Sequence, residues 1–330
     1  MAVKKSELYS SLWASCDKLR GGMDASQYKD YVLTLLFIKY VSDKFKDEPY
    51  GAIVIPEKSS FEDLVAHFND EAKLGKGQEM VDKLTDLIAI FQRPELNFKN
   101  NKAEDDDLIG DAYEFLMRKF ATVSGKSKGQ FYTPAEVSRI LAKVIDVAGC
   151  KNKNATIYDP ACGSGSLLIR AAKEAPFPLA IYGQEKDGST AGLAKMNLVL
   201  HNKAEGETAA DNTFSNPFYR NDTDDGQLRQ FDYVVANPPF SMKNWKDGLK
   251  EFGRFDDYDD RPPEKNGDYG TGIPTCIIVL DKEHAADRTG IFMIDASRGF
   301  MKDKDKNRLR EQDIYKIVTA FSSMHEIKGR

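Results

Sequence analysis

The stretch FDYVVANPPF, from Phe231 to Phe240, places an amide, two prolines and an aromatic ring directly after an apolar run. Asn237 offers a side-chain carbonyl acceptor, Pro238 leaves its own carbonyl free, and Pro239 restricts the backbone of the residue before it. Two rigid acceptors match the two hydrogens of an –NH2 group, and Phe240 offers a flat surface for a planar ring. The stretch therefore predicts a pocket for the exocyclic amine of an extruded base.

A glycine-rich turn occurs earlier, in DPACGSGSLL from Asp159 to Leu168. Gly163 and Gly165 let the backbone approach a ligand closely at the start of a helix. A nicotinamide dinucleotide fingerprint would need a third glycine where this chain has leucine, so that ligand is disfavoured. Asp159 would repel a diphosphate but suits a cationic or hydroxyl-bearing ligand. A simple strand–helix turn is the alternative for this motif taken alone.

An acidic residue, Glu185, closes the apolar run AIYGQE. An acid at the end of the second strand, shortly after a glycine turn, is placed to accept hydrogen bonds from ribose hydroxyls. A solvated surface acid is the alternative for this residue by itself. All three motifs follow predicted strands, and ligands of parallel sheets bind at the carboxyl ends of the strands.

The elements that must position these motifs alternate between strand and helix. Strands are predicted at ATIYDPA, LAIYGQE, FDYVVA, TCIIVLD and GIFMIDA, and helices at SLLIRAAKEA and STAGLAKMNLVLH. Such alternation predicts an α/β fold with a parallel sheet. Ahead of it, Thr133 to Glu136 predicts a capping box with proline at the first helical position.

The first 123 residues instead have helical periodicity. Their run YVLTLLFIKYV is about half of the ~20 residues that a membrane span needs, and it contains Lys39, which favours a core helix. The Gly/Ser/Lys-rich stretch from Ser124 to Gln130 predicts the domain boundary. We therefore expect a helical bundle at 1–123, for partner or DNA contacts, and a catalytic domain at 124–330.

The composition of the chain limits the kinds of metal site and binding partner that we expect. The 330 residues carry a net charge of −5, and the four cysteines form no CxxC pair. This spacing argues for reduced thiols in a cytoplasm and against a structural zinc site, and no other metal site is predicted. A protein that binds DNA by itself usually carries a net positive charge. A DNA substrate would therefore require another subunit to provide part of the binding surface.

The motifs DPACGSG, a following acid and NPPF together resemble S-adenosylmethionine-dependent amino-methyltransferases of DNA. With GQFYTP ahead of them, their order is similar to that of enzymes that methylate N6 of adenine. The stretches LWASCDKLRGGMDASQYKDYVLTLLFIKYVSDKF, TGIPTCIIVLDK and FMIDASRGF resemble the modification subunit of type I restriction–modification systems. The resemblance covers nearly the whole chain.

This resemblance implies a helical N-terminal domain followed by a Rossmann-like S-adenosylmethionine-dependent methyltransferase domain. Glu185 would hold the cofactor's ribose, and either Asp211 or Asn212 its adenine. The positions implied around the rest of the cofactor are Gln130, Phe131, Tyr132, Thr133, Pro134, Asp159, Ala161, Gly163, Ser164 and Gly165. The catalytic positions, which bind the target adenine, are Asn237, Pro238, Pro239 and Phe240.

The same resemblance implies the protein's partners and setting. These are double-stranded DNA, a specificity subunit that reads the sequence, a second modification subunit, and a restriction subunit with translocase and nuclease activity. The complex would be cytoplasmic and would have no contact with a membrane.

The chain departs from the family pattern near Gly270, where NGDYG runs straight into TGIPTCIIVLD. The resemblance implies a helix, a core strand and another strand segment in this interval. The stretch from Lys243 to Gly272 is rich in Asp, Gly and Pro and does not supply a core strand. We expect a sheet that lacks an inner segment and exposes apolar surface.

Two alternatives stay open at this point. One is another amino-methyltransferase that shares the Asn-Pro-Pro-aromatic corner and acts on a glutamine side chain or on RNA. The other is a non-catalytic assembly module that pairs through the helical domain.

Overall fold

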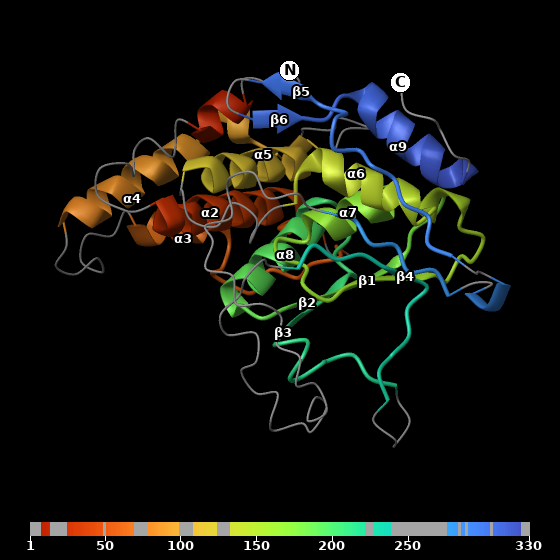
Figure 1. Ribbon diagram of the computed structural model, residues 1–330. Coiled ribbons are helices and arrows are strands. Elements are labelled where there is room, and N and C mark those ends of the chain that lie inside the picture. The colour runs from red at the N-terminus through yellow and green to blue at the C-terminus, as the bar shows by residue number, and fades with distance from the viewer. Residues whose placement is uncertain are drawn as a thin grey trace. The chain divides into compact units, whose positions relative to one another are not determined.

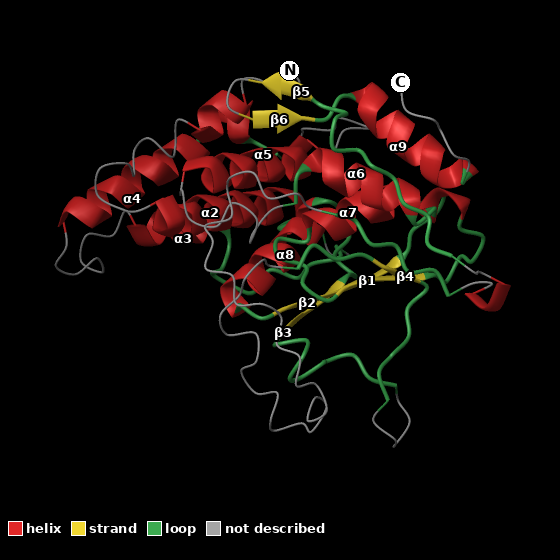
Figure 2. Ribbon diagram, in the orientation of Figure 1, coloured by secondary structure: helices red, strands yellow, loops and turns green. Residues whose placement is uncertain are grey.

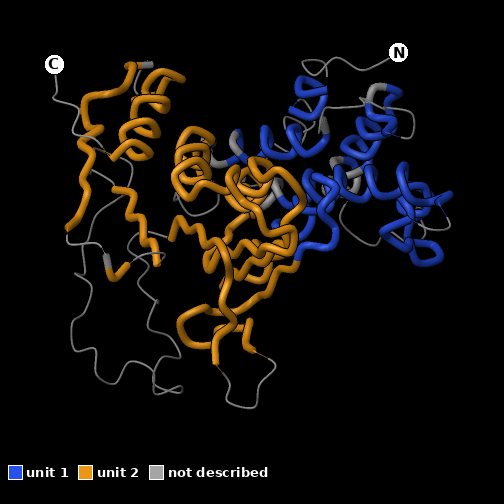
Figure 3. Tube along the Cα trace, turned by 90° about the vertical axis from the view of Figure 1, so that its right-hand side faces the viewer, with its two compact units in different colours: residues 1–132, 192–206 blue, residues 133–191, 207–330 orange. Residues whose placement is uncertain are grey.

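The chain forms two compact units in a computed structural model (Figure 1). Figure 3 colours them: one comprises Met1–Tyr132 with Gly192–Gly206, and the other comprises Thr133–Ala191 with Glu207–Arg330. The predicted boundary after residue 123 falls among undescribed residues and stays a prediction. The structure describes residues 8–13, 25–48, 51–68, 78–98, 108–123, 133–221, 227–238, 276–282, 285–287, 290–303 and 306–324.

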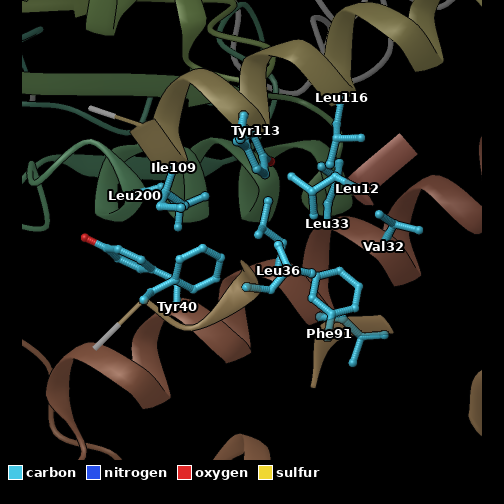
Figure 4. Packing of buried hydrophobic residues seen from close by; sticks show 14 of the residues in the cluster. Leu12, Val32, Leu33, Leu36, Tyr40, Phe91, Ile109, Tyr113, Leu116 and Leu200 are labelled. Atoms are coloured by element: carbon cyan, nitrogen blue, oxygen red, sulfur yellow. The ribbon is translucent and has the colours of Figure 1, made fainter. Parts of the chain in front are cut away.

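The first unit is helical. Its elements are a short helix at 8–13, α2 (Ala25–Phe45), α3 (Phe61–Phe68), α4 (Gln78–Phe91), the 3-10 turn η1 (Pro94–Leu96) and α5 (Leu108–Val123). Helix α2 packs against α3, α4 and α5. Figure 4 shows its Leu33 and Leu36 among Phe91, Tyr113 and Leu116, all fully or almost fully buried. The predicted core helix is therefore confirmed, and none of the described helices is both long and apolar enough to cross a membrane.

Lys39 is buried within α2 beside a carboxylate one turn later. Its Nζ lies 2.5 Å from Asp43 Oδ2, and the two side chains are 10% and 7% exposed. Asp43 Oδ2 also accepts the backbone N–H of Phe98 at 2.8 Å, and Ser42 Oγ accepts that of Phe61 at 2.7 Å. These polar groups tie the segments around residues 61 and 98 to α2.

Helix α8 (Gly188–Leu200) contributes its last two turns to this same unit. Leu193 and Leu200 belong to the apolar core of the first unit, and the Tyr113 hydroxyl donates to the Leu193 carbonyl at 3.0 Å. Lys44 Nζ donates to Asn202 Oδ1 at 2.5 Å, just beyond the end of the helix. The segment after Gly192 is thus held in the helical core, although the sequence analysis placed it in the catalytic domain.

The second unit is built on a four-stranded parallel sheet in the order β3-β2-β1-β4 (Figure 2). The strands are β1 (Thr156–Asp159), β2 (Ala180–Glu185), β3 (Glu207–Ala210) and β4 (Tyr233–Val234). Helix α7 (Ser166–Lys173) packs on β1 and β2, α6 (Ala135–Val144) packs on α7, and α9 (Glu311–Ser323) packs on α6. The predicted α/β class with a helical N-terminal domain is confirmed. The 3-10 turns η2 (Val147–Gly149) and η4 (Ala285–Asp287) complete the unit's helical elements in the described residues.

Side chains alternate between the faces of β1 and β2, as strand geometry requires. Tyr158 and Tyr182 are register partners and share one face. Tyr219 and Phe231 join them there, with the rings of Tyr158 and Phe231 stacked at 4.5 Å between centroids. Ile157 alternates to the opposite face and is fully buried. Aromatic packing thus fixes the connection between β3 and β4 against the sheet.

Two predicted strands are wrong. TCIIVLD and GIFMIDA have no strand in their described residues, 276–281 and 290–296. Ile278 is 75% exposed, Leu280 88% and Ile291 91%. A strand needs a neighbour to satisfy its backbone groups, and in the described chain β4 pairs with β1 alone. The two runs therefore have the apolar residues of a strand but no strand pairing in their described residues. This result is expected for a sheet that lacks an inner segment.

The predicted strand FDYVVA is shorter than expected, because only Tyr233 and Val234 pair with β1. Two other short strands, β5 (Met301–Asp303) and β6 (Lys306–Arg308), form a separate antiparallel pair. These strands lie later in the chain than the two apolar runs and contain mostly polar residues.

Candidate active site

The predicted site residues lie at the carboxyl ends of the strands. The strand order means that the chain runs from β1 outward to β3 and then returns to the other side of β1 as β4. Ligands of open parallel sheets bind at such a reversal. Asp159 ends β1, and Asn237 follows β4, so both predicted motifs lie at this switch point.

The glycine turn after β1 has a backbone that favours glycine. Gly163 and Gly165 have φ angles of 54° and 75°, in the left-handed region where a Cβ is strained. Gly165 precedes α7, and its carbonyl accepts the Ile169 N–H at 3.0 Å. The Cys162 N–H donates to the Gln184 carbonyl at 3.0 Å, which holds the turn against β2.

Glu185 is fixed by two backbone donors. Its Oε2 accepts the Gly163 N–H at 3.0 Å, and its Oε1 accepts the Asp187 N–H at 3.0 Å. Asp187 Oδ1 in turn accepts the Thr190 N–H at 2.8 Å, near the start of α8. An ionised carboxylate has about four acceptor sites, so Glu185 keeps capacity for hydroxyl donors while it orients the turn.

Asp159 is buried at the tip of β1, with 1% of its surface exposed. Its Oδ1 accepts the Ala161 N–H at 2.9 Å. Burial raises the pKa of this carboxyl to about 7, the Ala161 N–H opposes that rise, and the charge of Glu185 adds to it. Burial also raises the pKa of the neighbouring Cys162 thiol. Asp159 therefore changes charge near neutral pH and favours a cationic ligand in its ionised form.

The loop after β3 carries Asp211 and Asn212. The Asp211 N–H donates to the Glu185 carbonyl at 2.9 Å, which extends the pairing of β2 and β3 to the site. The Asp211 carboxylate accepts the Asn212 N–H at 2.7 Å, and Asn212 Oδ1 accepts the Phe214 N–H at 3.0 Å. Both side chains shape their own loop, and both stay candidates for the contact to the cofactor's adenine.

Two residues that were not predicted from the sequence tie this loop to the sheet. The Thr213 hydroxyl donates to the Pro160 carbonyl, in the turn after β1. Gln184 is fully buried, and its Nε2 donates to the carbonyls of Asp211 and Asn216 at 3.2 and 2.9 Å. A buried amide inside an otherwise apolar strand was the available signal for Gln184. The hydroxyl of Thr213 had no such signal.

Asn237 is bonded to a residue more than one hundred positions earlier. Its Nδ2 donates to Thr133 Oγ1 at 3.2 Å. The predicted capping box at Thr133 is wrong, because Pro134 is the N-cap residue of α6 and no side chain caps the helix. The Thr133 hydroxyl is instead engaged by Asn237, so the structure joins two of the predicted site motifs.

The other predicted site residues fall into two groups. Ala161 and Ser164 lie within the turn after β1, and Pro238 directly follows Asn237. Five positions lie outside the described residues: Gln130, Phe131, Tyr132, Pro239 and Phe240.

Comparison with known protein families shows which family the chain belongs to. The model of the N-6 DNA Methylase family matches residues 104–270 and 269–329, which is more than half of the chain. The chain belongs to the N-6 DNA methylase family. The model described as the HsdM N-terminal domain matches residues 8–147. The two N-6 DNA methylase segments meet at residues 269–270, where the sequence analysis expects family residues to be absent.

Relatives of the chain confirm the predicted resemblance to type I modification subunits. The type I restriction enzyme MpnII methylase subunit of Mycoplasma pneumoniae is 30% identical, over 82% of this chain and 61% of its own length. The MjaIX methylase subunit of Methanocaldococcus jannaschii is 28% identical, over 72% of this chain and 52% of its own. The chain thus spans about half to three-fifths of these relatives.

A solved structure has the same fold. It is the methyltransferase subunit of a type I restriction–modification system from Streptococcus thermophilus, with a TM-score of 0.71 and 23% identity. The match covers 98% of this chain and 94% of that one.

Substituting Gly183 by alanine should destabilise the protein. A Cβ there would lie 2.9 Å from Cys162 Sγ and 3.2 Å from Leu168 Cδ1, so β2 and the turn would have to separate. We expect a loss of about 1–3 kcal/mol in the free energy of unfolding, measured by urea denaturation. Gly192→Ala is the matched control, because it has open space at its Cβ and lies in a helix, where alanine stabilises by ~0.5–1 kcal/mol. Equal stability of the two variants would contradict the close approach.

Proposed function

We propose that this chain transfers a methyl group from S-adenosylmethionine to N6 of adenine in double-stranded DNA, as the modification subunit of a type I restriction–modification complex. The observation that carries the proposal is the bond from Asn237 to Thr133. It turns the amide nitrogen toward Thr133 and leaves the amide oxygen available at the switch point of a parallel sheet. In an N-6 DNA methylase, an acceptor at that place suits the amino group of adenine.

The chemistry of the turn supports S-adenosylmethionine as the cofactor. Glu185 is an oriented carboxylate with spare acceptor sites, which suits the ribose hydroxyls. Asp159 is a buried carboxyl that favours a cation, which suits the ammonium group of the methionine part. The proposed cofactor-binding set is Gln130, Phe131, Tyr132, Thr133, Pro134, Asp159, Ala161, Gly163, Ser164, Gly165, Glu185, and Asp211 or Asn212. When bound, the cofactor supplies an electrophilic methyl group on a sulfonium.

The chain's own contribution to the reaction is to prepare the nucleophile. An aromatic amine is a weak nucleophile because its lone pair is delocalised into the ring. Asn237 Oδ1 and the Pro238 carbonyl each accept one N–H of the amine, which localises the lone pair on nitrogen. For Pro239 and Phe240, which lie outside the described residues, the proposed roles are to stiffen this corner and to stack on the base. Positioning of two substrates is the main source of rate acceleration, and no covalent enzyme intermediate is involved.

The proposed partners follow from the family. They are DNA, a specificity subunit, a second modification subunit and a restriction subunit, in a cytoplasmic complex. The net charge of −5 is consistent with a DNA-binding surface to which another subunit contributes.

One observation favours a second candidate function, that of a non-catalytic assembly module. The apolar side chains of Ile278, Leu280 and Ile291 are exposed, and in the described chain β4 has one paired edge. A chain with this surface could pair with others without binding cofactor. Titration calorimetry with S-adenosylmethionine separates the two candidates, because an absence of binding supports assembly.

The direct test of the proposed function is methyl transfer from labelled S-adenosylmethionine to adenine-containing DNA, with and without a co-purified specificity subunit. We expect label in N6-methyladenine. Label in RNA or protein, with none in DNA, would instead support an amino-methyltransferase that acts on those substrates.

Asn237→Ala should lower kcat by roughly 10²–10³, by analogy with the removal of one charge-stabilising group elsewhere. The measurement is steady-state methylation of DNA at saturating cofactor and DNA. Asn154→Ala is the matched control, since Asn154 lies exposed in the loop before β1. An Asn237→Ala variant with wild-type kcat at matched cofactor saturation would refute the role.

The affinity for S-adenosylmethionine should rise as pH increases through about 7. Below that pH Asp159 is neutral, and above it the ionised carboxylate attracts the cofactor's ammonium group. In the ligand-free protein, a rise in pH has the opposite effect, because it lowers stability. The folded pKa lies above the ordinary 3.8, so ionisation lowers the free energy of unfolding as pH rises from about 4 to 7.

Titration calorimetry between pH 5.5 and 8.5 checks the affinity, with Asp159→Asn as the comparison. The cofactor's own amino group loses its charge at about 7.7–8.0, so the wild-type affinity should rise from pH 5.5 to a maximum between about 7 and 8 and then fall. We expect a flatter profile in Asp159→Asn than in the wild type, together with higher thermal stability of the ligand-free variant at pH 8. Identical pH profiles would exclude Asp159 as the titrating group.

A further inference from the structure

We propose that Thr133 is a positioning residue, which holds the Asn237 amide with its oxygen directed to the target amine. The inference rests on the proposed function and deepens it. It assigns Thr133 a task in the orientation of the nucleophile's partner, beyond the cofactor contact that the family resemblance implies. The contact that supports it is the hydrogen bond from Asn237 Nδ2 to Thr133 Oγ1, at 3.2 Å.

Both ends of this bond are anchored in the fold. Thr133 is 8% exposed and directly precedes Pro134, whose carbonyl accepts the Ser138 N–H and hydroxyl at 3.0 and 3.2 Å. On the other side, the Val235 N–H donates to the Tyr158 carbonyl at 2.9 Å and holds the end of β4 to β1. The β-branched side chain of threonine also has restricted χ1 freedom.

The chemistry explains why the orientation matters. The two ends of an asparagine amide have nearly the same shape, but one carries two donors and the other is an acceptor. If the amide of Asn237 were rotated by 180°, its N–H groups would face the donors of the amine. The Thr133 hydroxyl accepts one N–H of the amide, and once its own hydrogen is donated to another acceptor it can no longer donate to Oδ1, so the orientation in which Oδ1 is free is selected.

The hydroxyl can do this without giving up other interactions. Its oxygen accepts from Asn237, and its hydrogen stays available to an acceptor on the cofactor. Cofactor binding and amide orientation are therefore linked functions of one side chain, because the cofactor engages the hydrogen that would otherwise be free to bond Oδ1. A valine, which has the same shape and no hydroxyl, removes the orientation without leaving a cavity.

The kinetic test compares Thr133→Val and Thr133→Ser at saturating cofactor. We expect Thr133→Val to lower kcat by roughly 3- to 10-fold, the effect of one neutral hydrogen bond, and Thr133→Ser to restore most of the rate. In an Asn237→Ala background, Thr133→Val should have no further effect on kcat. An equal loss in both backgrounds would overturn the proposal, because Thr133 would then act independently of Asn237.

A matched control is Thr156→Val, which removes another hydroxyl bonded to a neighbouring side chain. Thr156 Oγ1 donates to Asp232 Oδ2 at 2.8 Å at the amino end of β1, opposite the site. We expect this variant to change thermal stability and to leave kcat at the wild-type value. A loss of kcat equal to that of Thr133→Val would identify a general effect of destabilisation and would overturn the proposal.

An activity-independent test uses nuclear magnetic resonance of the ¹⁵N-labelled chain. The side-chain amide signals of Asn237 are identified by their loss in Asn237→Ala. We expect Thr133→Val to shift them and to speed their hydrogen exchange, while Thr133→Ser and Thr156→Val preserve them. Unchanged Asn237 signals in Thr133→Val would overturn the proposal even if the chain methylates DNA. Shifted signals in a chain that transfers no methyl group would support the orientation and reject the proposed function.

Discussion

The Glu185 carboxylate ties the end of β2 to the glycine turn after β1, and the rest of the site depends on this interaction. It accepts the Gly163 N–H, while the Cys162 N–H donates to the carbonyl of Gln184 directly before it. Both bonds require β2 and the turn to lie in close contact, which the missing side chain of Gly183 permits. The turn, the start of α7 and the tip of β1 are thereby held in one arrangement before any ligand binds.

Burial and charge give the two carboxyl groups of the site different tasks. Glu185 is stabilised by backbone donors and presents an oriented acceptor surface. Asp159 lies deeper, and its burial raises its pKa to about 7, so its ionisation is suited to a cation. The Asn237 amide is uncharged and donates a hydrogen bond to Thr133. A cofactor with hydroxyl and ammonium groups, and a substrate with an amino group, fit this division.

Much of the secondary structure follows from local sequence patterns, but these patterns do not show which segments pair or pack with one another. β1, β2 and the turn between β1 and α7 were predictable, because an apolar run, a terminal acid and two glycines specify them together. The apolar runs TCIIVLD and GIFMIDA were wrongly predicted as strands, since pairing depends on a neighbour that local pattern does not reveal. Thr133 matched a capping pattern, yet its hydroxyl bonds to Asn237 far along the chain. The apolar residues of α8 could not indicate which unit's core receives them.

We infer that the end of β2 and the glycine turn form a binding site for S-adenosylmethionine. Titration calorimetry of the wild type and Glu185→Ala with S-adenosylmethionine tests it most directly. The loss of a charged acceptor for hydroxyl groups is worth about 1.5–3 kcal/mol for each hydrogen bond. We expect saturable binding by the wild type and an affinity at least roughly 10-fold weaker in the variant. The same dissociation constant for both proteins, or no binding by the wild type, would contradict the claim.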